Sequence, residues 1–232
     1  DIDRRVEHLV TAEVRVASFA QAPDRRTVDT LKAAGVVVIP TIGARRHAEK
    51  VAEWGVDAVI AQGAEGGGHT GVVPTSLLIR QVLDAIDTPV IAAGGFTDGR
   101  SLAAALAWGA DAVAMGTRFL LTGDSDVPDS IKAIYLATPV TGTVVTRAVD
   151  GAPQRVVTTP MVERLERSRL SAFPRAALNA LRFRSLTGTP MRDLLAEGVR
   201  MKRSGNLTWG QVAMAANAPM LTRAALVDGH LE

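Results

Sequence analysis

The chain has 232 residues, of which 47% are hydrophobic and 22% charged, and its formal net charge is only +2. This balance is typical of a globular protein with one large or two small domains, and the scattered arginines and 4% aromatic content do not indicate a nucleic-acid-binding surface. The absence of cysteine excludes disulfides, catalytic thiolates and cysteine-ligated metals, and no hydrophobic run approaches the roughly 20 residues of a membrane span.

The chain begins at Asp1, in a stretch that we interpret as a loop, and no signal peptide is visible. Because no signal peptide is visible, we expect a cytoplasmic protein. Because the chain begins with Asp1 and not with methionine, we expect it to be incomplete.

Residues 14–122 alternate between two kinds of pattern. Nearly continuous apolar runs predict strands that are buried on both faces, as in a parallel sheet covered by helices. Helical segments separate them, and Asp24 and Asp98 are N-cap candidates, whereas Gly35 and Gly109 are stop signals. The predicted strands are 14–20, 36–42, 57–63, 89–95 and 110–119, and the predicted helices are 24–35, 45–55, 75–86 and 98–109. Such repeated units predict an α/β fold with its function at the carboxyl ends of the strands.

The pattern changes after residue 122. β-branched residues around the turn signal "VDGAP" predict a short hairpin over 143–157. Residues 160–228 contain a series of helical patterns, several of which begin at threonine or proline. We therefore divide the chain into a βα part, 1–122, and a mostly helical module that covers the substrate, 123–232.

Three glycine-rich segments each follow a predicted strand. A tight turn explains one or two glycines of 63–71, but the run "GGGH" also lets a flat or anionic ligand approach the main chain. Segment 92–99 precedes a helix, so its N–H groups can hold a phosphate, and segment 114–119 ends the next strand. Each loop could be a plain turn, but two successive loops of this kind are expected after strands 7 and 8 of a βα barrel.

His69 lies in the first of these loops, where it can act as a general base or hydrogen-bond donor, or cap the loop as a structural residue. His8, His47 and His230 lie near the chain ends or among the charges of a predicted helix, and we expect no role for them. No histidines and carboxylates have the spacing of metal ligands, and no GxSxG motif is present, so we expect neither a metal site nor a nucleophile elbow.

The segments "DAVIAQGAEGGGHTG" (57–71) and "PVIAAGGFTDGRSLAAALAWGADAVAMGTRFLLT" (89–122) resemble the nitronate monooxygenase family, formerly called 2-nitropropane dioxygenases. The resemblance implies an FMN-dependent TIM (βα)8 barrel. The family includes enoyl-acyl-carrier-protein reductases and actinobacterial CoA-ester oxidoreductases of steroid-ring degradation, and the long helical tail resembles the latter branch. Because a barrel needs eight strands and five are predicted, we expect the first three to be missing from this chain.

By this resemblance, His69 corresponds to the catalytic histidine beside the flavin. The flavin-binding positions implied by the resemblance are Gln62, Gly63, Gly67 and Gly68 after the third predicted strand, Ala93, Gly94 and Gly95 after the fourth, and Met115, Gly116 and Thr117 after the fifth. FMN suits such loops, because its phosphate is dianionic and its flat ring needs close approach of the main chain. Thr41 stands where nitronate-oxidising members often carry a lysine.

The resemblance predicts an FMN-dependent oxidoreductase, and the activity that we expect first is that of a nitronate monooxygenase. In such an enzyme His69 would take or position a proton on the substrate carbon next to nitrogen, and O2 would be consumed. The alternative is a reductase or dehydrogenase acting on an acyl-CoA or acyl-carrier thioester. The arginine-rich segment 164–184 then contacts CoA phosphates, unless it is a solvated helix face. We expect a small-molecule substrate, nitronate or acyl thioester, and a homodimer as a candidate assembly, with neither nucleic acid nor membrane as partner.

Two alternatives from other classes share the glycine loops. One is a flavin-free phosphate-binding barrel that acts as a lyase or isomerase, and the visible absorption of flavin distinguishes it. The other is a noncatalytic ligand-binding barrel, in which replacing His69 has little effect.

Overall fold

The structure is a computed structural model that describes residues 2–148 and 152–167. It divides into two compact units, 1–134 and 135–232, which are described separately. Our division after residue 122, with a substrate-covering role for the second part, remains a prediction. The helical patterns predicted beyond residue 167 lie outside the described residues.

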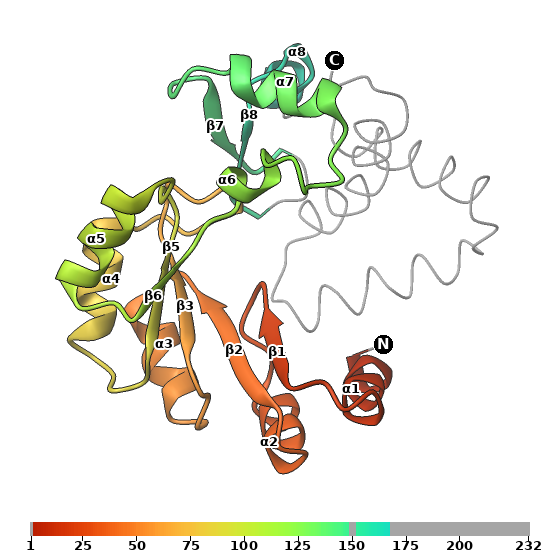
Figure 1. Ribbon diagram of the computed structural model, residues 1–232, viewed down its shortest axis with the longest axis vertical. Helices are drawn as coiled ribbons and strands as arrows, with labels where there is room; N and C mark the ends of the chain where they lie inside the picture. The colour runs from red at the N-terminus through yellow and green to blue at the C-terminus, as the bar shows by residue number, and fades with distance from the viewer. Residues whose placement is uncertain (1, 149–151, 168–232) are drawn as a thin grey trace. The chain divides into compact units, whose positions relative to one another are not determined.

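The first unit is built on a five-stranded parallel sheet with the strand order β1-β2-β3-β5-β6 (Figure 1). Its strands are β1 (Val16–Phe19), β2 (Val37–Ile42), β3 (Val59–Gln62), β5 (Val90–Ala93) and β6 (Ala112–Ala114). The helices that connect them are α2 (Arg25–Ala33), α3 (Arg45–Ala52), α4 (Thr75–Leu83) and α5 (Gly99–Trp108). The strict βα alternation and sequential strand order confirm the α/β, barrel-type fold predicted from the sequence.

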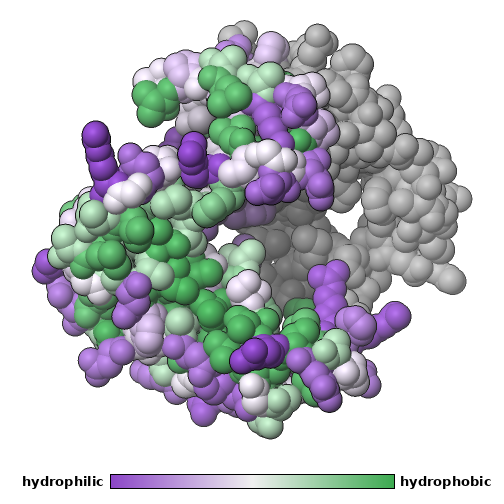
Figure 2. Space-filling view, in the orientation of Figure 1, coloured by the Kyte–Doolittle hydropathy of each residue, from purple (hydrophilic) through white to green (hydrophobic). Residues whose placement is uncertain are grey.

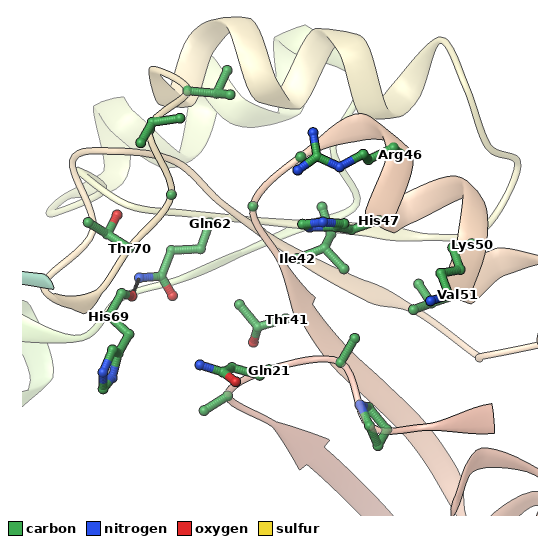
Figure 3. Close-up of a pocket in the computed structure, with 18 of the residues that line it drawn as sticks. Gln21, Thr41, Ile42, Arg46, His47, Lys50, Val51, Gln62, His69 and Thr70 are labelled. Atoms are coloured by element: carbon green, nitrogen blue, oxygen red, sulfur yellow. Dashed lines mark hydrogen bonds between the residues drawn. The ribbon is translucent and has the colours of Figure 1, made fainter. Parts of the chain in front are cut away.

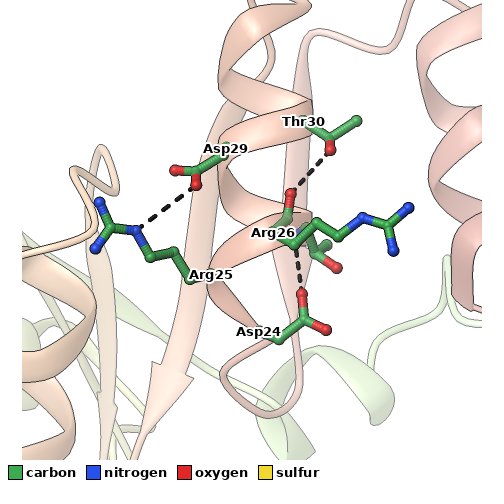
Figure 4. A network of polar contacts seen from close by, with 6 residues as sticks. Asp24, Arg25, Arg26, Asp29 and Thr30 are labelled. Carbon is green, nitrogen blue, oxygen red and sulfur yellow. Dashed lines mark hydrogen bonds and ion pairs between the residues drawn. The ribbon is translucent and has the colours of Figure 1, made fainter.

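Helix starts and stops follow the expected local chemistry. The Asp24 carboxylate accepts a hydrogen bond from the Thr27 N–H at 2.8 Å, and the Arg25–Asp29 pair lies along α2 at 3.6 Å (Figure 4). This N–H is the main reason that the pKa of Asp24 lies below its usual value. Asp98 and Ser101 form a reciprocal capping box at α5, and Gly109 ends that helix with a left-handed φ of 104°. The predicted N-caps and glycine stop signals are therefore confirmed.

The core lies between the helices and one face of the sheet. Along β2, Val38, Pro40 and Ile42 are buried, whereas the residues between them are half-buried or exposed. Leu31 on α2 and Leu78 on α4 are fully buried against the strand side chains. Figure 2 shows hydrophobic residues gathered in a band across this unit, with hydrophilic residues at its edges. The other face of the sheet is less buried than the sequence predicted.

A local sequence occurs twice in this unit, as "WGVDAV" from Trp54 and "WGADAV" from Trp108. In both copies the aspartate precedes a strand, and its carboxylate accepts an N–H near the start of the neighbouring strand at 2.8 Å. Asp57 accepts from Val38, the second residue of β2, and Asp111 accepts from Val90, the first residue of β5. The repeated aspartates thus anchor the amino ends of β2 and β5, and so help to align their carboxyl ends.

Two predictions about elements are wrong, and one helix was not predicted. Residues expected to form a loop at the start form α1 (Ile2–Thr11), because Val6, Leu9 and Val10 pack one helical face against the core. The strand predicted over 110–119 ends at Ala114, and a one-turn helix, α6 (Thr117–Leu120), follows it. An unpredicted helix, α7 (Asp129–Ala137), comes next.

The second unit contains the predicted hairpin. Strands β7 (Thr143–Thr146) and β8 (Gln154–Val157) pair antiparallel, with Thr143 opposite Val157 and Thr146 opposite Gln154. Helix α8 (Pro160–Arg167) follows, at the first of the predicted helical patterns. Within the described ranges, no helix is long and apolar enough to cross a membrane.

Candidate functional site

The three glycine loops begin at the same level of the sheet. Gln62 at the end of β3 is in register with Ala93 at the end of β5, and Ala93 is in register with Ala114 at the end of β6. Because the strands are parallel, the loops that follow all emerge at one edge. The structure therefore brings together the three segments in which the sequence predicted a ligand.

These loops also pack closely on one another. A Cβ atom added to Gly94 would lie 3.0 Å from both the Gly63 carbonyl oxygen and the Gly66 nitrogen. At Gly63 an added Cβ would lie 2.2 Å from the Thr75 Oγ1, and at Gly95 it would lie 3.2 Å from the Glu65 Cβ. We name as the glycine rim the residues Gly63, Gly66, Gly94, Gly95 and Gly116. An added side chain would collide with the Thr75 main chain at Gly63, and it would make tight contacts at Gly66, Gly94 and Gly95.

The main chain of the rim has conformations that favour glycine. Gly94 and Gly95 have φ angles of 97° and 85°, in the left-handed region that other residues rarely adopt. Within the described residues, no hydrogen bond uses the N–H groups of Gly94, Gly95 or Gly116. These N–H groups can therefore donate hydrogen bonds to an anionic ligand. The N–H groups of Thr97 and Asp98 are already used, since both donate to the Ser101 hydroxyl.

A polar network joins the first loop to the second. The Glu65 carboxylate accepts hydrogen bonds from the N–H and hydroxyl of Thr75, the first residue of α4. The Thr75 hydroxyl also lies 3.0 Å from the Gly94 carbonyl oxygen. Glu65 thus substitutes for a side-chain cap at α4, whose N-cap position is Pro74. The network fixes the first loop relative to the second.

His69 occupies a two-residue strand, β4 (Gly68–His69), and its side chain is exposed. The Gln62 amide donates to the His69 carbonyl oxygen at 2.8 Å, and the buried Thr70 hydroxyl donates to the Gly63 carbonyl oxygen at 2.9 Å. The chain at His69 and Thr70 is therefore held to the end of β3. The histidine is accessible to a ligand and is positioned by residues at the carboxyl edge of the sheet.

His69 borders a cavity of about 540 Å³ in the first unit. Gln62 and His69 lie at one end, Gln21 and Thr41 lie between, and Arg46 and Lys50 lie at the other end (Figure 3). This volume is in the range of small-molecule binding sites. None of the five residues of the glycine rim lines this cavity, although Gln62, the residue before Gly63, does. The site therefore has two adjoining parts, a main-chain cradle and a side-chain cavity.

Sequence reasoning missed several residues of the cavity. His47, for which we expected no role, lines it together with Arg46 and Lys50, all on α3. Partial burial lowers the pKa of His47, and the charges of Arg46 and Lys50 lower it further, so the imidazole is neutral at physiological pH. A signal was present in the helical spacing of Arg46 and Lys50, which puts both on one face.

The other predicted site residues have mixed environments. Thr117 reaches the first loop, since its Oγ1 would lie 3.8 Å from a Cβ on Gly67, whereas Ala93 is buried and contributes only its main chain. The half-buried Met115 side chain packs against the core. Gly68 has a left-handed φ of 70° beside His69. Most of the arginine-rich segment 164–184 lies outside the described residues.

The glycine rim fits the FMN that the resemblance implies. Free N–H groups on Gly94, Gly95 and Gly116 suit a dianionic phosphate, and the absence of side chains suits a flat ring close to the main chain. The described residues contain no group of three His, Cys, Asp or Glu side chains that could hold a metal ion.

Comparison with known proteins identifies the family of this chain. The family model described as nitronate monooxygenase matches residues 1–227. A protein of Rhodococcus jostii named (3aS,4S,5R,7aS)-5-hydroxy-7a-methyl-1-oxo-octahydro-1H-indene-4-carboxyl-CoA dehydrogenase is 57% identical over 99% of this chain, which spans 65% of that relative.

Two solved structures are also similar. FabK (M276A) from Thermotoga maritima has a TM-score of 0.67 and 39% identity. The match covers 75% of this chain and 58% of the FabK chain. A nitroalkane oxidase from Streptomyces ansochromogenes has a TM-score of 0.65 and 37% identity. This match covers 70% of this chain and 50% of the oxidase chain. With the family model matching nearly the whole chain, this protein belongs to the nitronate monooxygenase family of oxidoreductases.

Proposed function

We propose that this chain forms part of an FMN-dependent dehydrogenase that oxidises the CoA thioester of a fused-ring carboxylic acid. The observation that carries the proposal is the adjoining position of the glycine rim and the exposed His69 at the carboxyl ends of β3, β5 and β6. The substrate class is supported by the 57% identity to a CoA-ester dehydrogenase over 99% of the chain.

In this proposal the residues divide the work between holding the cofactor and moving a proton. The N–H groups of Gly94, Gly95 and Gly116 hold the phosphate, and FMN, when bound, supplies the two-electron redox chemistry. Dehydrogenation removes a proton and a hydride equivalent from the substrate, and His69 is placed to take the proton. Gln62 orients His69 through the carbonyl oxygen of that residue.

Nitronate monooxygenase activity, our first expectation from the sequence, is the second candidate. It is favoured by the description of the family model and by the 37% identity to a nitroalkane oxidase. Against it, identity to the CoA-ester dehydrogenase is higher and extends over more of the chain. Thr41, in the position of the lysine found in many nitronate-oxidising members, lines the same cavity as His69.

An anaerobic reduction experiment tests the proposal. We expect the purified protein to be yellow, to release FMN on denaturation, and to lose its visible absorbance when a fused-ring acyl-CoA is added. Reduction of the flavin by alkyl nitronates and not by the CoA ester, together with O2 consumption in a parallel aerobic assay with the nitronate, would favour the monooxygenase. A colourless active protein would favour the flavin-free lyase or isomerase. The homodimer and the cytoplasmic location remain predictions.

A further inference from the structure

The end of the cavity farthest from His69 is basic. We name as the basic wall the residues Arg46, His47 and Lys50, all on α3 (Figure 3). Of the described residues that line the cavity, none is an aspartate or glutamate, while Gln21 and Thr41 are neutral hydrogen-bonding groups. The basic wall therefore faces a cavity without negative charge.

The charges of Arg46 and Lys50 do not stabilise helix α3. Arg46 and Lys50 are four residues apart on one face, so their charges repel each other. The carboxylate of Glu49 is 2.8 Å from the Nε of Arg45. Within the described residues, neither Arg46 nor Lys50 forms an ion pair with a carboxylate. A negatively charged ligand would relieve the repulsion.

Lys50 is also held in place. Its ammonium group lies 5.1 Å from the centre of the Trp54 ring, a cation–π contact, and Trp54 lines the same cavity. The pKa of His47 is lowered by partial burial first and by Arg46 and Lys50 second, so this imidazole adds no charge of its own. Arg46 and Lys50 are therefore the two cations that the wall offers.

We propose that Arg46 and Lys50 bind the phosphate groups of the CoA part of the substrate, while the thioester end extends past Thr41 toward His69. The inference rests on the proposed function, and it assigns to α3 the contact that sequence reasoning gave to segment 164–184. Phosphates suit this wall because a guanidinium donates paired hydrogen bonds and an ammonium supplies a compact charge. Because Arg46 and Lys50 lie at the end of the cavity away from His69, the anionic end of the ligand would be separate from the reacting end (Figure 3).

Calorimetric titration of the holoprotein with free CoA and with pantetheine, which lacks the phosphates, tests the inference. The double variant Arg46→Gln/Lys50→Gln should lose about tenfold to hundredfold in CoA affinity, as expected for lost charged hydrogen bonds. Its pantetheine affinity and its visible flavin spectrum should be unchanged. The control Arg45→Gln alters an arginine of the same helix that does not line the cavity, and should bind CoA like the wild type.

The outcomes separate the two proposals. If the wild type binds CoA and the double variant binds it equally well, the role of Arg46 and Lys50 is wrong and the substrate class stands. Equal affinity of the wild type for CoA and pantetheine also overturns that role. If the wild type binds no CoA and no CoA ester reduces its flavin, the proposed function itself fails.

Discussion

The glycine rim and the basic wall differ in the chemical groups that they offer to a ligand. The rim offers main-chain N–H groups, two of them in left-handed conformations that favour glycine, whereas the wall offers side-chain cations on the surface of a helix. A side chain added at Gly63 or Gly94 has to displace neighbouring atoms, whereas replacing Arg46 or Lys50 removes a charge from an exposed helix surface. The rim therefore suits a cofactor that stays bound, and the wall suits a substrate that comes and goes.

The two regions also depend on different parts of the chain. The rim follows β3, β5 and β6, where the strand register places three loops together. The wall lies on α3, which follows β2. Flavin content and substrate affinity should thus respond to separate sets of substitutions.

Gly63→Ala should give the largest effect and test whether the rim depends on close packing. The new Cβ would lie 2.2 Å from the Oγ1 and 2.3 Å from the Cα of Thr75, so the loop has to move. We expect loss of bound flavin and about 1–3 kcal/mol less stability, measured by flavin absorbance and chemical denaturation. In the control Gly99→Ala the Cβ meets nothing within 4 Å, so both properties should be kept. Normal flavin content in Gly63→Ala would contradict the cradle.

His69→Ala separates chemistry from cofactor binding. Turnover should fall at least about 100-fold, because a positioned general base contributes that much, while flavin content stays unchanged. Steady-state kinetics and the visible spectrum measure these two effects. His8→Ala, an exposed histidine on α1, is the control and should leave turnover unaffected. Full activity in His69→Ala would remove the proposed role of this residue.

Gln62→Leu should have a smaller effect at the junction of the two regions. It removes the amide that donates to the His69 carbonyl oxygen, at a cost of about 1 kcal/mol. Because the imidazole loses its fixed orientation, we expect kcat to fall about tenfold with the flavin retained. The control is Gln81→Leu on the exposed side of α4. A normal kcat would show that other contacts suffice to orient His69.

Asp57→Asn should have the smallest effect, because it alters the scaffold beneath both regions. Burial alone would raise the pKa of Asp57, but hydrogen bonds from Lys32 and the Val38 N–H lower it overall. A carboxyl with a lowered pKa stabilises the fold above its unfolded pKa, and this contribution disappears as pH falls through the folded value. The variant should therefore lose about 1 kcal/mol at neutral pH and converge with the wild type below about pH 4.

Chemical denaturation at neutral and acidic pH measures this difference. Asp87→Asn, which alters an exposed aspartate before β5, serves as the matched control. A constant difference between Asp57→Asn and the wild type across this pH range would contradict the assigned contacts.

Local sequence was sufficient to predict the loops that form the glycine rim. Apolar runs, aspartate caps and glycines after strands are all properties of neighbouring residues, so β2, α5 and the loop before His69 were predictable from the chain itself. The "WGVDAV" and "WGADAV" copies could also have been recognised, since both aspartates anchor a strand in the same way. The amphipathic pattern of α1 was present as well, but the first residues were interpreted as a loop.

The basic wall could be recognised only from the tertiary structure. Spacing along the chain puts Arg46 and Lys50 on one face of α3, but it does not say whether that face meets solvent or a cavity. That depends on how α3 packs beside β2 and on where the loops after β1 and β3 end, which are contacts between residues far apart in sequence. The sequence by itself determined which loops could hold a ligand, and only the packing of helices on the sheet decided which side chains share a cavity with His69.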